Sequence, residues 1–126
     1  AYDAAGVDAA LLPFIEDTAQ AYAEADIIVC RAGASTVTEI AAVGAAALFV
    51  PFPAAVDDHQ THNAQFLVQA GGGWLLQQRD LTPGGLAQML QNTERAALLQ
   101  RAEQAKTMQK IEATAAVVAA CEELAR

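Results

Sequence analysis

Short apolar runs alternate along the chain with longer stretches of mixed polarity. The runs at residues 27–30 and 47–50 are continuous and apolar, which predicts buried strands of a parallel sheet, the first of them buried on both faces, and the run at 73–76 predicts a further strand. A further run at residues 11–15 predicts either a short strand or an extended loop. The strands should therefore lie in the interior of the domain.

Helical spacing of apolar residues fills the intervals between these runs. It predicts helices at 18–25, 35–43 and 59–70, followed by three more at 83–90, 94–105 and 111–125. Asp17 or Thr18 suits the N-cap of the first helix, and Gly44 suits the residue after the second. The order β-α-β-α-β-α-β, then helices, predicts an α/β domain with a Rossmann-like parallel sheet flanked by helices.

Composition and charge narrow the classes of function. The chain has 126 residues, is 54% hydrophobic and carries a net charge of −8, which suits one domain with a buried core. The acidic balance argues against nucleic acid and against an electrostatic membrane patch as partners. No apolar run reaches the length of a membrane span, and the first residues lack the basic region and the long apolar region of a signal peptide. The chain opens without Met, and we expect it to be a fragment.

Cysteine spacing gives no metal signal. Cys30 and Cys121 form no CxxC pair, so reduced thiols in a cytoplasmic protein are the simplest interpretation. We expect neither a metal nor a cofactor.

The first candidate site is the turn and helix start from Gly33 to Glu39. A glycine between a buried strand and a helix lets the backbone approach a ligand, and the free N–H groups of the first helical turn suit a phosphate. A carboxylate at Glu39 can accept the hydroxyls of a ribose. The alternative is purely structural, because Thr36 and Glu39 have the spacing of a capping box.

The second candidate is the polar stretch 57–63, Asp-Asp-His-Gln-Thr-His-Asn. Gln60 and Asn63 share a helix face, and amides both donate to and accept from sugar hydroxyls. Two alternatives remain. His59 and His62 could bind a metal, although spacing offers no third strong ligand, and Asp57 or Asp58 could simply cap the helix. A third candidate is the loop at Ile15, whose backbone could bind the edge of a nucleobase.

Two motifs together resemble the donor site of the MurG family of bacterial glycosyltransferases. They are Cys30-Arg31-Ala32-Gly33-Ala34-Ser35-Thr36-Val37-Thr38-Glu39-Ile40 and Leu48-Phe49-Val50-Pro51-Phe52-Pro53 followed by Asp57-Asp58-His59-Gln60-Thr61-His62-Asn63-Ala64. The resemblance implies the GT-B architecture, with residues 1–126 as an incomplete C-terminal, UDP-GlcNAc-binding domain. The acceptor domain and the strand with a Gly-rich loop that begins the family's C-terminal domain are absent.

The resemblance also assigns roles to residues. Ile15 is expected to bind the uracil through its backbone, the segment from Ala34 to Glu39 the diphosphate and ribose, and Gln60 and Asn63 the sugar. The predicted donor-binding residues are therefore Ile15, Gly33, Ala34, Ser35, Thr36, Val37, Thr38, Glu39, Gln60 and Asn63. Arg31 is a secondary candidate for stabilising the leaving UDP. The catalytic residues are unknown and are expected in the absent domain.

The implied activity is that of an inverting transferase. It moves N-acetylglucosamine from UDP-GlcNAc to undecaprenyl-pyrophosphoryl-MurNAc-pentapeptide, converting lipid I to lipid II in peptidoglycan synthesis. Its partners would be the donor, lipid I and the cytoplasmic face of the inner membrane, the last two through the absent domain, and the isolated piece should be inactive. Two alternatives stay open, namely a donor-binding subunit of a split glycosyltransferase and an enzyme similar to UDP-GlcNAc 2-epimerases.

Overall fold

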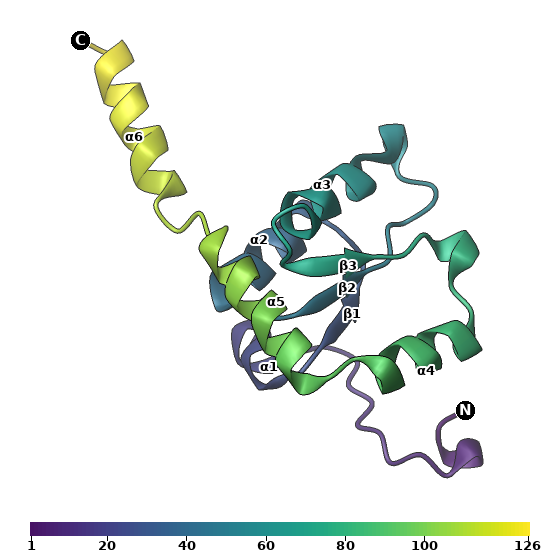
Figure 1. The fold of residues 1–126 in the computed structure, drawn as a ribbon. Helices are drawn as coiled ribbons and strands as arrows, with labels where there is room; N and C mark the ends of the chain where they lie inside the picture. Colours follow the sequence, from purple (N-terminus) through teal and green to yellow (C-terminus); the bar gives the residue numbers. More distant parts are fainter.

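The protein is an α/β domain in which a small parallel sheet is surrounded by helices (Figure 1). The computed structural model describes residues 1–126, apart from the side chain of Val56. Its elements are, in order, η1 (Asp3–Ala5), α1 (Thr18–Glu24), β1 (Ile28–Cys30), α2 (Ala34–Val43), β2 (Ala47–Phe49), η2 (Val56–Asp58), α3 (His59–Val68), β3 (Gly73–Leu75), η3 (Gln78–Asp80), α4 (Pro83–Asn92), α5 (Arg95–Thr107) and α6 (Ala113–Leu124).

The sheet has the order β1-β2-β3, and both strand pairs are parallel. Ala47 in β2 is paired with Ile28 in β1 and with Gly73 in β3. Helices α2 and α3 make the two crossovers and pack against each other. The predicted Rossmann-like α/β class is therefore confirmed, and the carboxyl ends of the strands meet at one edge of the sheet.

The three strands differ in how far their side chains are buried. All three residues of β2 are buried, as the continuous apolar run predicts. In β1, at the edge of the sheet, Val29 is 47% exposed, so the prediction of burial on both faces is wrong for this strand. Helices cover the two faces of a parallel sheet, and the described helices leave the side chain of Val29 partly uncovered.

Residues 11–15 form an extended loop rather than a strand, so the strand alternative for this run is wrong. Leu11, Leu12 and Phe14 are 70%, 67% and 77% exposed. The sheet accordingly has three strands instead of the four that the apolar runs suggested. A strand needs a neighbour to satisfy its backbone N–H and C=O groups, and no strand of the described residues lies beside this segment.

Local chemistry sets several helix ends. Asp17 caps α1 by accepting a hydrogen bond from the N–H of Gln20 at 2.9 Å, as predicted for one of the two candidate caps. Gly44 ends α2 with a φ of +78°, a conformation that an L-residue adopts only with strain. These two signals place α1 and α2 on the chain independently of the tertiary fold.

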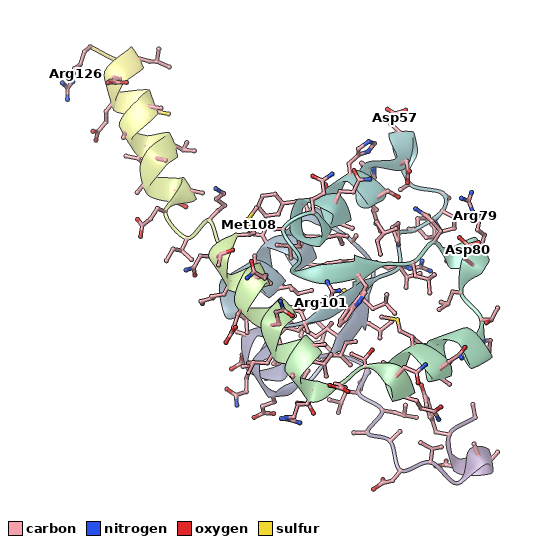
Figure 2. The ribbon with its side chains drawn as sticks, viewed as in Figure 1. Asp57, Arg79, Asp80, Arg101, Met108 and Arg126 are labelled. Atoms are coloured by element: carbon pink, nitrogen blue, oxygen red, sulfur yellow. The ribbon has the colours of Figure 1, made fainter. Side chains whose placement is uncertain are left out.

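Helix α5 lies across the starts of the strands at very short range. A Cβ atom added at Gly72 would come within 2.9 Å of the backbone N and Cα of Ala105, so glycine is required for this approach. Figure 2 shows Arg101 on the same helix, beside β3. Its guanidinium lies 4.0 Å from the centre of the Trp74 ring and donates to the carbonyl of Gly73 at 3.1 Å. Trp74 is thus half-buried under an arginine.

Helix α6 projects away from the domain into solvent (Figure 1), and every residue from Lys110 to the end of the chain is exposed. In the part of the chain that the structure describes, no helix combines the length and the apolar character that crossing a bilayer requires.

Candidate functional site

The two polar segments singled out in the sequence leave the carboxyl ends of neighbouring strands. The turn at residues 31–33 follows β1 and enters α2, whereas the loop at residues 50–55 follows β2 and leads through η2 into α3. Because β1 and β2 are paired in parallel, both segments lie at the same edge of the sheet. In open α/β sheets this edge is where ligands bind.

Helix α2 presents an uncapped N-terminus at this edge. Its N-cap is Gly33, which has an extended backbone (φ −62°, ψ 149°) and no side chain to cap the first turn. Among the described residues, no hydrogen bond uses the backbone N–H groups of Ala34, Ser35 or Thr36. Three donors and the positive end of the helix dipole are therefore available to an anion.

The capping-box alternative for this segment is wrong. The helix begins at Ala34, two residues before Thr36, so Thr36 lies inside the first turn and cannot be its N-cap. The hydroxyl of Thr38 donates back to the carbonyl of Ala34 at 2.9 Å, as hydroxyls inside helices commonly do. The backbone, rather than these side chains, supplies the chemistry of the α2 N-terminus.

Glu39 lies further along α2 and is exposed. Its negative charge acts on Tyr22 in the neighbouring helix α1, whose pKa is raised. Burial is the largest cause of that raised pKa, followed by the negative charges of Glu39 and of the Cys30 thiolate. Glu39 is thus an exposed carboxylate on α2 itself, five residues after the helix begins at Ala34.

The amides of α3 reach across to the turn after β1. The N–H of Ala32 donates to Oε1 of Gln60 at 3.2 Å, and Nδ2 of Asn63 donates to the carbonyl of Ala32 at 3.0 Å. Oε1 of Gln60 also accepts from the N–H of Phe52 at 3.0 Å. The side-chain amides of Gln60 and Asn63, which the sequence predicted to share a helix face, are therefore both hydrogen-bonded to the backbone of Ala32.

Arg31 also links the turn after β1 to the loop after β2. Its Nη1 donates to the carbonyls of Val50 and Pro51, both at 3.1 Å, and its guanidinium carbon lies 5.5 Å from the centre of the Phe52 ring. Sequence reasoning considered Arg31 only as a phosphate ligand. The structure shows that its Nη1 atom is hydrogen-bonded to the loop after β2.

The acidic stretch before α3 is shaped by its own side chains. Asp57 and Asp58 both have left-handed backbones, with φ of 52° and 53°, and Figure 2 shows Asp57 at the outer tip of the loop. Asp58 occupies the N-cap position of α3, yet its carboxylate accepts from the hydroxyl of Thr61 at 2.6 Å instead of from a backbone N–H. The ring of His62 is hydrogen-bonded through Nδ1 to the carbonyl of Asp58.

The described residues contain no group of three or more His, Cys, Asp and Glu side chains that could hold a metal ion.

The structure does not bring all predicted residues together. Gly33, the first turn of α2, Gln60 and Asn63 converge, whereas Ile15 lies on the exposed segment before α1 and is itself 44% exposed. A hollow of about 360 Å³ lies between α2 and α3 and was missed by sequence reasoning. Its lining combines Ala34, Thr38 and Asn63 with Val37, Ala41, His62, Phe66, Met108 and Lys110.

These features define a Rossmann-like α/β domain in which the uncapped start of α2 and two amides of α3 meet at the edge of the sheet where ligands commonly bind. Comparison with protein families gives the specific assignment, since residues 2–120 match the glycosyltransferase family 28 C-terminal domain. The chain belongs to this family.

The sequences of several relatives match the chain over almost its whole length. A UDP-N-acetylglucosamine–N-acetylmuramyl-(pentapeptide) pyrophosphoryl-undecaprenol N-acetylglucosamine transferase of Polaromonas naphthalenivorans (strain CJ2) is 79% identical over 98% of the chain and 34% of that relative. A protein of the same name from Paracidovorax citrulli (strain AAC00-1) is 76% identical, over 98% of the chain and 35% of the relative. The resemblance to MurG proteins is therefore confirmed, and the chain spans about a third of the length of the curated relatives it matches.

A solved structure agrees with this assignment. The crystal structure of Acinetobacter baumannii MurG superimposes with a TM-score of 0.87 and 47% sequence identity, over 93% of the chain and 36% of that protein. The α/β architecture is thus that of the MurG C-terminal region.

Proposed function

We propose that this chain is the donor-binding domain of a transferase that moves N-acetylglucosamine from UDP-GlcNAc to undecaprenyl-pyrophosphoryl-MurNAc-pentapeptide. The observation that carries the proposal is the uncapped N-terminus of α2, held beside the amides of α3 and followed by the exposed carboxylate of Glu39. The names of relatives at 79% and 76% identity support the same donor and acceptor.

In this proposal each part of the site meets one part of the donor. The N–H groups of Ala34, Ser35 and Thr36 bind the diphosphate, Glu39 accepts the ribose hydroxyls, and Gln60 and Asn63 lie beside the sugar. Gly33 lets the phosphate approach the backbone closely. The backbone at Ile15 would bind the uracil once the segment before α1 lies against the nucleotide.

The reaction would be a single displacement with inversion. A hydroxyl oxygen of the acceptor sugar attacks the anomeric carbon, the bond from that carbon to the β-phosphate oxygen breaks, and UDP leaves with the electron pair. The proton of the hydroxyl passes to a base that we expect in the part of the full-length protein outside this chain. The start of α2 stabilises the charge that develops on UDP, in the manner of an oxyanion hole.

The acceptor carries a lipid, so we also propose that the full-length protein works peripherally at the cytoplasmic face of the inner membrane. Fractionation of cells tests this placement. Recovery of the protein from washed membranes, with release by high salt or mild detergent, is the expected result, and exclusive recovery from the soluble fraction would contradict it.

Binding of UDP tests the donor site itself. Glu39→Gln in the full-length gene product should weaken UDP about tenfold by calorimetry, because a charge-assisted hydrogen bond to the ribose is lost. The same substitution should leave the affinity for 2′,3′-dideoxy-UDP unchanged, since that nucleotide lacks both hydroxyls. Glu103→Gln on α5, another exposed carboxylate, is the matched control. Equal weakening of both nucleotides would contradict the ribose role.

Product analysis tests the activity. Full-length protein supplied with radiolabelled UDP-GlcNAc and the lipid-linked acceptor should transfer label to the lipid and release UDP. Formation of an epimeric UDP-sugar in place of a labelled lipid would favour the epimerase-like alternative. Transfer that depends on a second polypeptide would favour the split glycosyltransferase.

A further inference from the structure

We propose that Gln60 and Asn63 are positioning residues that hold the β1–α2 turn in the conformation which receives the donor's diphosphate. This inference deepens the proposed function and rests on it. It assigns the two amides a task that is separate from any contact with the sugar.

Both hydrogen-bonding groups of one backbone residue are held from α3. Ala32 is fully buried, its N–H donates to Oε1 of Gln60, and its carbonyl accepts from Nδ2 of Asn63. Each buried backbone N–H and C=O group must find a hydrogen-bond partner. Here the two partners come from side chains on a helix that lies roughly thirty residues further along the chain.

The chemistry of the partners fixes the orientation of each amide. A backbone N–H can only donate and a backbone carbonyl can only accept, so neither side chain can be reversed without losing its bonds. Oε1 of Gln60 is engaged twice, because it also accepts from the N–H of Phe52. Oε1 of Gln60 and Nδ2 of Asn63 are therefore both occupied by hydrogen bonds to the backbone of the protein.

The residue that these amides hold directly precedes the N-cap of α2. Gly33 has no side chain to fix its own conformation, and glycine has the widest range of backbone angles. Holding Ala32 restricts the entry into the helix, so the N–H groups of Ala34, Ser35 and Thr36 point in one direction before a ligand arrives. Donors arranged in advance bind an anion without the entropic cost of ordering the loop.

Binding of UDP, which lacks the sugar, separates positioning from sugar contact. In the full-length gene product, Asn63→Leu and Gln60→Met should each weaken UDP about tenfold, and UDP-GlcNAc by a similar factor, because each leaves part of the Ala32 backbone without a partner. Both substitutions are neutral, so charge repulsion with the phosphates plays no part. Gln65→Leu, at an exposed position of the same helix, is the matched control. Weakening of UDP-GlcNAc with unchanged UDP would overturn the proposal and leave only a sugar contact.

Amide hydrogen exchange without ligand gives a second, independent measurement. Gln60→Met should raise the exchange rates of the Ala32 and Phe52 amides above those of the β2 amides, whereas Gln65→Met should not. Unchanged rates at Ala32 and Phe52, or an equal rise throughout β2, would overturn the positioning role. If the unsubstituted protein bound no UDP, the proposed function would fail instead, and the exchange result would still report on the turn.

Discussion

Replacing Arg31 tests how the two segments that form the site are held together. Its Nη1 donates to the carbonyls of Val50 and Pro51, and its guanidinium lies over the ring of Phe52. In Arg31→Met the aliphatic stem remains while both hydrogen bonds and the cation–π contact are lost. The substitution therefore isolates the guanidinium.

The magnitude follows from the surroundings of the two carbonyls. Val50 is 6% exposed and Pro51 is fully buried, so water replaces the lost donors poorly. A hydrogen bond from a charged group contributes about 1.5–3 kcal/mol. One partly exposed Nη1 group makes both bonds, so we take the lower end and expect Arg31→Met to lower the free energy of unfolding by about 2 kcal/mol. For a domain of this size that equals a fall in Tm of about 8 °C.

Urea unfolding of the chain, followed by the fluorescence of Trp74, measures this loss. Arg31→Lys should recover part of it, because an ammonium can reach one carbonyl but lacks the planar group that lies over Phe52. The control is Arg79→Met. Arg79 is 83% exposed and its ion pair with Asp80 spans 3.7 Å, so this change should alter stability by less than about 0.5 kcal/mol. Equal effects of Arg31→Met and Arg79→Met would refute the reasoning.

Two further predictions concern packing and pH. Gly72→Ala should destabilise the chain by about 2–3 kcal/mol in urea unfolding, because its Cβ would lie 2.9 Å from the backbone of Ala105, whereas Gly84→Ala meets no atom within 4 Å and should be neutral or slightly stabilising. Burial raises the pKa of the Cys30 thiol from its ordinary 9.0 to about 11, so a thiol reagent at pH 8 should modify the exposed Cys121 quickly and Cys30 slowly. The same shift predicts a contribution to stability that is complete below pH 9 and lost as the pH rises through 11; a Cys30→Ala variant with an unchanged profile over that range would contradict it.

Local signals predicted those parts of the fold that depend on a few adjacent residues. The side chain of Asp17 and the left-handed backbone of Gly44 mark helix ends wherever the helices lie in space. The buried character of β2 could be read from its continuous apolar run. The convergence of the turn after β1 with the loop after β2 followed from parallel pairing alone.

Other features depend on contacts between distant segments and could not be predicted. Thr36 has the spacing of a cap, yet α2 begins two residues earlier, at Ala34 after Gly33. The run at 11–15 has the composition of a strand, but a strand exists only beside a partner. The role of Arg31 in joining two loops was equally hidden, since its carbonyl partners lie 19 and 20 residues away.

The solvent-exposed helix α6 has a thermodynamic consequence. It contains 12 residues, a length at which an isolated helix in water is only marginally stable, and all of its side chains are exposed. Its opening is therefore uncoupled from unfolding of the core that surrounds β2, so the chain contains two cooperative units of very different stability. A denaturation midpoint measured by helical ellipticity mixes the two, and the fluorescence of Trp74, which lies against α5, reports on the core alone.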